Sequence, residues 1–168
     1  LVHHVLLGNH DYMGNVSAQI LYTNKYWDLP QAYYKRTYSM KGVDLCLIFI
    51  DTIHWDKTQI QWIETQLAEC SSQKDSWTIV SGHYPIWSAA MYSDDTRLIN
   101  DLVPLLHRYG VQLYLCGHEH NHGIYSDGKV IQVLSGAAAA SRGVIAFKPH
   151  NMQIWGLSGK DTTGYIRL

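Results

Sequence analysis

Residues 113–121 read LYLCGHEHN, in which four strand-forming residues are followed directly by a short polar turn. The same order of features occurs at residues 77–85, WTIVSGHYP, and at residues 5–11, VLLGNHD. Each apolar run predicts a buried strand, and each turn contains a glycine and a histidine. Ligands bind outside the carboxyl ends of strands in open α/β sheets, so these three turns are expected to surround one crevice.

The rest of the sequence also has the pattern of an α/β domain. Residues 45–50 predict another strand, and residues 57–68 and 96–109 have the apolar spacing of helices. Asp56 is the expected N-cap of the first helix, and Pro104 is expected to kink the second. The remainder of the chain is β-rich, with short strands predicted at residues 130–134, 143–147, 152–155 and 165–168.

Length and composition fit one compact domain, because the chain has 168 residues of which 46% are hydrophobic. A formal net charge of −1 gives no electrostatic reason to expect a nucleic-acid partner. No apolar run is long enough to predict a membrane span. Since the sequence opens within a predicted strand at Leu1, we expect the true N-terminus, and any signal peptide, to lie upstream.

The cysteine pattern gives no metal-binding or disulfide signature. Cys46, Cys70 and Cys116 make an odd number without a Cys-x-x-Cys pair, so we expect all three to be buried small hydrophobic residues. Asn15 begins an Asn-Val-Ser sequon and is a candidate glycosylation site, which is consistent with a secretory route.

The three turns carry the side chains of a metal site. His118 and His120 are separated by one residue, so in extended backbone both imidazoles point to the same side and can bind one metal ion or two adjacent ones. His83 is a third candidate ligand, and Asn9 offers a neutral oxygen donor. Each feature alone has a structural explanation. His118 and His120 could be solvated in a surface turn, His83 could be a hydrogen-bonded core histidine, and Asn9 could belong to a turn cap. Their occurrence in three equivalent turns favours metal binding.

His10 is followed by Asp11, the order expected for an imidazole that a carboxylate polarises. Such an imidazolium can donate a proton to a departing oxygen. The pair is therefore our candidate for catalysis.

Taken together, the blocks GNHDY at 8–12, GHYPIWS at 82–88 and CGHEHN at 116–121 resemble the calcineurin-like metallophosphoesterases, and within them the small, mammalian-type purple acid phosphatases. The resemblance implies an α/β fold, part of an αββα sandwich with mixed sheets flanked by helices, with residues 1–168 as the C-terminal part of the domain. It implies hydrolysis of phosphate monoesters at acid pH, on small phosphomonoesters or phosphoproteins, in a secreted or lysosomal setting.

The resemblance also implies a cofactor and residue roles. The cofactor would be a dinuclear centre of Fe(III) and a divalent iron, zinc or manganese ion. Asn9, His83 and His118 would bind the divalent ion, and His120 the ferric ion. His10 would contact the phosphate or protonate the leaving alcohol, with Asp11 behind it.

The sequence departs from this family pattern in several places. Two upstream blocks that supply the bridging Asp, a second Asp and a Tyr ligand do not occur in the chain, so it is expected to bind metals weakly and hydrolyse little. Tyr92 stands where mammalian members have a substrate-binding His, and we expect its hydroxyl to bond a phosphate oxygen. Glu119 replaces the usual Asp and is not expected to be a ligand.

Two other functions remain open at this point. One is a different metallophosphoesterase, such as a phosphodiesterase or nucleotidase. The other is a non-catalytic scaffold that keeps the phosphatase fold without its metals.

Overall fold

The computed structural model describes residues 2–73, 76–141, 150–157 and 163–167. It has the expected α/β fold, built on a mixed seven-stranded sheet with the strand order β3-β4-β5-β6-β8-β7-β9. β4, β5, β6 and β8 run parallel, whereas β3, β7 and β9 are antiparallel to their neighbours. The strands are β3 Tyr34–Met40, β4 Val43–Phe49, β5 Ser76–Ser81, β6 Leu113–Cys116, β7 His122–Ser126, β8 Ile131–Ser135 and β9 Gln153–Leu157.

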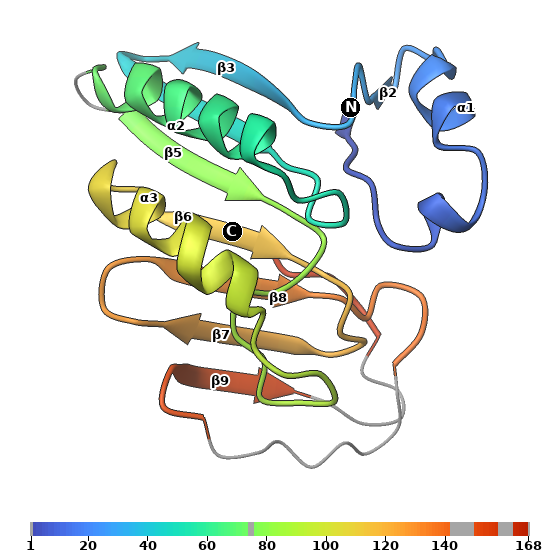
Figure 1. Cartoon of the computed structure of the whole chain (residues 1–168), viewed down its shortest axis with the longest axis vertical. Coiled ribbons are helices and arrows are strands. Elements are labelled where there is room, and N and C mark those ends of the chain that lie inside the picture. Colours follow the sequence, from blue (N-terminus) through green and yellow to red (C-terminus); the bar gives the residue numbers. More distant parts are fainter. Residues whose placement is uncertain (1, 74–75, 142–149, 158–162, 168) are drawn as a thin grey trace.

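Helices α2 (Lys57–Ser71) and α3 (Val103–Arg108) lie on the same face of this sheet, as Figure 1 shows. The Asp56 side chain caps α2 by accepting a hydrogen bond from the Gln59 backbone N–H at 2.8 Å, as the sequence predicts. Ile63 and Leu67 of α2 are buried in the main hydrophobic core, together with Ile48 and Val80 of the sheet. The main core therefore fills the layer between the helices and the sheet.

The second predicted helix is irregular, as expected from its proline. Leu98–Leu102 form a π-helical turn, and regular α-helix begins only at Val103. Pro104 lacks the backbone N–H that would bond one turn back, so the ladder is interrupted at this point.

A smaller N-terminal unit packs against β3 and β4. It consists of β1 (His3–His4), β2 (Trp27–Asp28), a 3₁₀ turn at Asp11–Met13 and α1 (Val16–Leu21). Leu7 and Leu29 of this unit form a second core with Tyr34 and Phe49 of the sheet. The Tyr34 hydroxyl donates to the backbone oxygens of Val5, at 2.7 Å, and Asp28, at 2.8 Å. These contacts fix the position of the Gly8–Asp11 turn relative to the sheet.

The sheet face away from α2 and α3 carries exposed apolar side chains. Tyr38, Val43 and Trp77 are 44%, 44% and 50% exposed. With Leu45 and Lys41 they line a shallow hollow of about 440 Å³ at one end of β3, β4 and β5. We call Tyr38, Val43, Leu45 and Trp77 the apolar sheet face.

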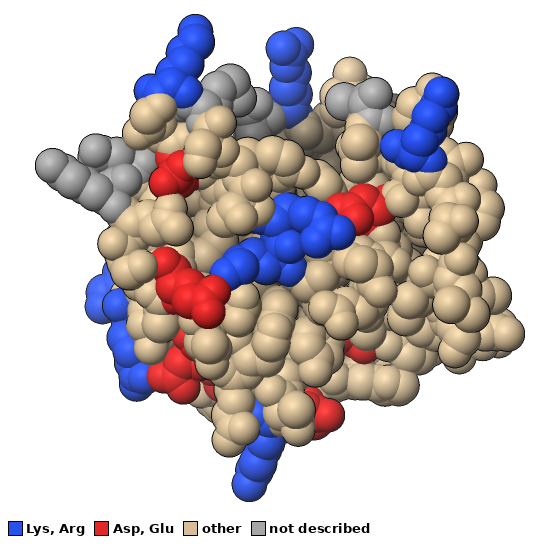
Figure 2. Space-filling view, turned by 90° about the horizontal axis from the view of Figure 1, so that it is seen from above, with Lys and Arg blue, Asp and Glu red and all other residues tan. Residues whose placement is uncertain are grey.

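Charged side chains on the β3 side of the molecule occur in opposite-sign pairs. Lys35 pairs with Glu69, and Arg36 pairs with Asp28 at 2.6 Å. In Figure 2, the basic side chains near the middle of the face in view lie between acidic ones. In the described part of the chain, no helix is long and apolar enough to cross a membrane.

Several sequence predictions are wrong or fall outside the described residues. Residues 5–7 are not a strand, although Leu7 is buried as predicted, because packing against Tyr34 and Phe49 buries this run without strand pairing. Residues 165–167 are outside any strand, and the strand predicted at 143–147 lies outside the described residues.

The disulfide prediction is also corrected. Cys46 of β4 and Cys70 of α2 form a disulfide, with their Cα atoms 6.1 Å apart. They face each other because α2 packs directly on β4, a contact that linear spacing does not reveal. Cys116 is a buried free cysteine, as predicted.

Candidate active site

The Gly82–Pro85 and Gly117–Asn121 turns lie at one edge of the sheet because β5 and β6 are parallel neighbours. The backbone N–H of Gly117 donates to the His83 carbonyl at 3.0 Å, which joins the two turns directly. The Gly8–Asp11 turn reaches the same edge from the N-terminal unit, where Asn9 Oδ1 lies 2.8 Å from His83 Nε2. The three polar turns therefore converge, as the sequence predicts.

Glycine is required where these turns approach most closely. A Cβ on Gly8 would lie 2.9 Å from the His83 ring, and a Cβ on Gly82 would lie 2.6 Å from the Tyr114 hydroxyl. A Cβ on Gly136, which follows β8, would overlap the carbonyl oxygen of Glu119. Each would force backbone or a packed ring to move.

His118 is held in an unusual backbone conformation at the centre of the site. Its φ of 67° lies in the left-handed region, which costs a non-glycine residue free energy unless the surroundings impose it. Its imidazole is 5.1 Å from that of His83, and 4.5 Å from the ring of Tyr84, between ring centroids. The Tyr92 ring stacks on it from another side, with a centroid distance of 4.5 Å and an interplanar angle of 28°.

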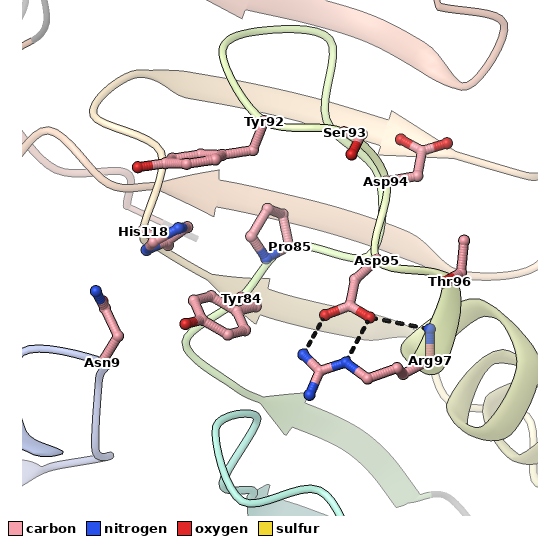
Figure 3. Close-up of a pocket in the computed structure, with 10 residues that line it drawn as sticks. All are labelled: Asn9, Tyr84, Pro85, Tyr92, Ser93, Asp94, Asp95, Thr96, Arg97 and His118. Atoms are coloured by element: carbon pink, nitrogen blue, oxygen red, sulfur yellow. Dashed lines mark hydrogen bonds and ion pairs between the residues drawn. The ribbon is translucent and has the colours of Figure 1, made fainter.

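Six of the predicted site residues line one cavity of about 130 Å³: Asn9, His10, His83, Tyr92, His118 and His120, with Gly136 as the seventh lining residue. A wider cleft of about 590 Å³ shares Asn9, Tyr92 and His118 with this cavity. In Figure 3, the Tyr92 ring lies over His118, and the Asn9 side chain faces them from the N-terminal turn. We call these two spaces the histidine cavity and the outer cleft.

The outer cleft has a charged pair at its far end. Arg97 donates to the Asp95 carboxylate at 2.6 and 3.1 Å, and this pairing raises the pKa of Arg97. The guanidinium also lies 5.9 Å from the centroid of the Tyr84 ring. The cleft therefore combines aromatic walls near His118 with the Arg97–Asp95 pair and a second carboxylate, Asp94, further out.

The site favours neutral imidazole at His83. Burial, followed by the nearby His118, lowers the pKa of His83 to about 4. Metal ions bind the neutral form of histidine, so this environment suits a ligand.

Two predicted residues lie elsewhere. The Asp11 carboxylate accepts a hydrogen bond from the Gly8 backbone N–H at 2.7 Å and so closes the Gly8–Asp11 turn. The Asn15 side chain caps α1 by accepting from the Ala18 backbone N–H at 3.1 Å. The polarising role of Asp11 and glycosylation at Asn15 remain predictions.

The candidate ligands have the donor atoms of a metal centre, but they are too few for a dinuclear one. Asn9, His83, His118 and His120 supply neutral nitrogen and oxygen donors around one space, which suits a divalent ion such as zinc or iron. No carboxylate lines the histidine cavity in the described part of the chain. Nor do any three His, Cys, Asp or Glu side chains among the described residues form a group that could hold a metal ion. The described residues alone therefore do not complete a dinuclear centre.

Asp51 and Thr52, which directly follow β4, supply contacts that support the site, as the sequence predicts for this polar pair. Asp51 accepts hydrogen bonds from the Tyr12 hydroxyl and from the Ile53 backbone N–H at 2.8 Å. Thr52 Oγ1 accepts from the Tyr84 backbone N–H at 3.0 Å, which supports the His83 turn. A polar pair directly after β4, at the same edge of the sheet, is the signal that points to this supporting role.

Comparison with known proteins supports the family resemblance that the three turns carry. The sequence profile described as "Calcineurin-like phosphoesterase" matches residues 1–122. Tartrate-resistant acid phosphatase type 5 of Rattus norvegicus is 36% identical over 159 residues, which cover 80% of this chain and 48% of that protein. The Homo sapiens protein of the same name is 35% identical with the same coverage. The chain thus spans about half the length of these curated relatives.

Solved structures share the fold. A purple acid phosphatase from yellow lupin (Lupinus luteus) seeds superposes with a TM-score of 0.65 and 22% identity, covering 92% of this chain and 32% of that one. GAP50, described as the anchor in the inner membrane complex of Plasmodium, superposes with a TM-score of 0.79 and 24% identity, covering 94% of this chain and 55% of that one. At these identities the likeness concerns the fold alone.

Proposed function

The chain belongs to the calcineurin-like phosphoesterase family, and on this basis we propose that it carries part of the active site of an acid phosphatase that hydrolyses phosphate monoesters. The observation that supports this most directly is the meeting of Asn9, His10, His83, His118 and His120 around one cavity. These donors come from three turns that are far apart in the sequence.

Asn9, His83, His118 and His120 are the proposed metal ligands, and the proposed cofactor is Fe(III) with a divalent iron, zinc or manganese ion. A dinuclear centre of this kind offsets the charge of the phosphate and supplies a hydroxide nucleophile. Its anionic ligands would have to come from residues other than those that line the histidine cavity.

His10 and Tyr92 are the proposed contacts to the phosphate group. His10 lines the histidine cavity, where its imidazolium can donate a proton to the departing alcohol oxygen. Asp11, next to it, would support the charged ring. The Tyr92 hydroxyl can donate a hydrogen bond to a phosphate oxygen from the wall shared with the outer cleft.

We also propose that the protein acts outside the cytosol, in a secreted or lysosomal setting. The Cys46–Cys70 disulfide favours an oxidising compartment. Asn15 lies at the surface, at the start of α1, where a glycan would meet solvent.

The test is a set of three assays on the full-length protein, with p-nitrophenyl phosphate, bis(p-nitrophenyl) phosphate and a nucleoside monophosphate, each at pH 5 and pH 7.5. An acid phosphatase should prefer the monoester and the lower pH. Preference for the diester would instead identify a phosphodiesterase, and preference for a nucleoside monophosphate a nucleotidase.

His118→Ala provides the residue-level prediction. We expect activity on the monoester to fall by at least about a hundredfold, because the variant loses a metal ligand and a ring contact. The circular dichroism spectrum should stay close to that of the wild type. Wild-type turnover in this variant would overturn the assignment.

A non-catalytic scaffold is the second candidate, favoured by the lack of a carboxylate among the described lining residues of the histidine cavity. Four convergent ligand-type side chains argue against it, since a scaffold has no use for them. Metal analysis of the full-length protein decides between the two. Less than about one metal ion per two chains, together with no turnover, would favour the scaffold.

A further inference from the structure

A fully buried carboxylate lies behind the histidine cavity. Glu119 has 0% exposure, although charged residues are almost never fully buried without a partner. Its Oε1 atom accepts hydrogen bonds from the Ser88 hydroxyl at 2.8 Å and from the Tyr92 backbone N–H at 2.7 Å. One oxygen atom thus holds both ends of the segment from Ser88 to Tyr92.

This carboxylate connects two walls of the cavity. Glu119 follows His118 directly in the turn after β6, so its backbone belongs to the cavity wall that carries His118. The Tyr92 ring, on the other side, stacks on the His118 imidazole at 4.5 Å between centroids. The position of the Tyr92 ring over His118 therefore depends on the length and geometry of the Glu119 side chain.

The segment from Ser88 to Tyr92 is also held in place by bonds that do not involve Glu119. The Ser88 backbone N–H donates to the Asp94 carboxylate at 2.9 Å, and the Ala89 backbone N–H donates to the Tyr125 hydroxyl at 3.2 Å. Both bonds anchor the same segment independently of Glu119.

Stability does not explain the carboxylate either. Among the described residues, the second oxygen of Glu119, Oε2, is buried and has no hydrogen-bond partner. A buried carboxylate with one unsatisfied oxygen costs free energy relative to an apolar side chain of similar size. Its presence is better explained by a geometric task than by a gain in folding stability.

We propose that Glu119 is a positioning residue that sets the Tyr92 ring over His118 and so places the Tyr92 hydroxyl for contact with the substrate phosphate. This assignment rests on the proposed function, because it concerns how that same site binds a phosphate group. Glu119 acts through Tyr92 and is not itself a contact to the substrate.

The test is a double-mutant cycle in the full-length protein with Glu119→Met and Tyr92→Ala. Methionine keeps the volume of the side chain but removes the acceptor. In the wild-type background, Glu119→Met should raise KM for p-nitrophenyl phosphate, and the inhibition constant of inorganic phosphate, by about tenfold with a smaller change in kcat. In the Tyr92→Ala background, the same substitution should change both constants less than about twofold.

Glu119→Gln is the matched rescue variant. Its amide oxygen can accept the same two hydrogen bonds, so its KM should stay within about threefold of the wild type. Equal effects of Glu119→Met in both backgrounds, or a lower melting temperature without a change in KM, would show a purely structural role and overturn the assignment.

Failure of the proposed function gives a different result. A wild-type protein that neither turns over the monoester nor binds inorganic phosphate in calorimetry would overturn both proposals. A wild-type protein that is active, but shows no coupling between Glu119 and Tyr92, would overturn only the positioning role.

Discussion

His118 shows how the site depends on single backbone positions. Its left-handed φ of 67° would be easier for glycine, yet the position carries the imidazole around which His83, Tyr84 and Tyr92 are arranged. A residue stays in a costly backbone conformation only when the surrounding structure holds it there. The surroundings here are the hydrogen bonds of the turn itself, including Glu119 N–H to the Gly117 carbonyl at 2.8 Å.

Gly136→Ala should disturb this turn from the end of β8. The new Cβ would overlap the Glu119 carbonyl oxygen, so either β8 or the His118 turn must shift. We expect a loss of stability of about 2 kcal/mol, typical of overpacking a tight site, and a clear loss of phosphatase activity. Urea unfolding and the monoester assay measure the two effects.

Gly14→Ala is the control for this prediction. The nearest atom to its added Cβ is the Asp11 carbonyl oxygen at 3.7 Å, an ordinary contact. Its effects on stability and activity should be small. Equal losses in the two variants would show that crowding at Gly136 is not the cause.

At the residue scale, the sequence predicted which candidate residues would meet, but only part of what supports them. Asn9, His83, His118 and His120 could be placed together because each lies at a strand end or polar turn, which is a local pattern. Their roles as ligands remain predictions. The contacts of Glu119 and Gly136 could not be predicted, since they depend on how the Ser88–Tyr92 segment and the end of β8 pack on the His118 turn.

At the scale of elements, the N-terminal unit is tied to β3 by a partly buried charge cluster. Asp28 of β2 accepts hydrogen bonds from two guanidinium nitrogens of Arg36, Nη2 at 2.6 Å and Nε at 2.9 Å, and lies 2.6 Å from Nδ1 of His4. Burial alone would raise the pKa of Asp28, but the bonds from Arg36 and His4 outweigh it, and the pKa lies below its usual value.

Asp28→Asn should therefore change how stability depends on pH. In the unfolded chain Asp28 takes up a proton near its ordinary pKa of 3.8, whereas folded Asp28 stays charged to lower pH. Its contribution to stability is therefore present above about pH 4 and is lost as the pH falls further. The variant should be about 2 kcal/mol less stable at pH 7, and the difference should shrink towards pH 2. Urea unfolding between pH 2 and 7 measures it.

Asp101→Asn serves as a comparison for Asp28→Asn. Asp101 accepts a hydrogen bond from the Trp55 indole at 3.0 Å, and no salt bridge to it occurs among the described residues. Its effect on stability at pH 7 should be small, because the asparagine side chain keeps an oxygen acceptor for the indole. If Asp28→Asn lowers the free energy of unfolding by the same amount at every pH from 2 to 7, the charge of Asp28 is not the cause of the loss.

Apolar runs predicted the strands of the main sheet well, but residues 5–7, which are also apolar, are buried without strand pairing. The strands around residues 45–50, 77–80 and 113–116 are continuous apolar runs, and all three are confirmed as β4, β5 and β6. β3 was not predicted because Lys35 and Arg36 interrupt its apolar pattern, as is common for an edge strand. The Cys46–Cys70 disulfide was missed because it depends on the packing of α2 on β4.

At the scale of the whole molecule, the two faces of the sheet differ. The face under α2 and α3 is covered by these helices (Figure 1). The apolar sheet face, in contrast, carries exposed tyrosine, valine and tryptophan side chains. Parallel strands are normally buried on both faces, so this surface is unusual for a chain in water.

Trp77→Lys should reduce binding of a hydrophobic dye to the 168-residue chain produced by itself. Trp77 is the largest side chain of the apolar sheet face and is 50% exposed, so dye fluorescence should fall by about half. Met13→Lys is the control, because Met13 is 76% exposed but lies in the 3₁₀ turn rather than on this face. A similar fall for both would show that the dye does not report on the apolar sheet face.

The contact between Asn9 and His83 spans 74 residues of sequence. During translation, at about 5–20 residues per second, the GNHD turn emerges from the ribosome seconds before its partner strands have been made. A nascent or truncated chain therefore cannot assemble the cavity, however well its early segments fold. The histidine cavity would therefore form only after residues as late as Gly136 have been made.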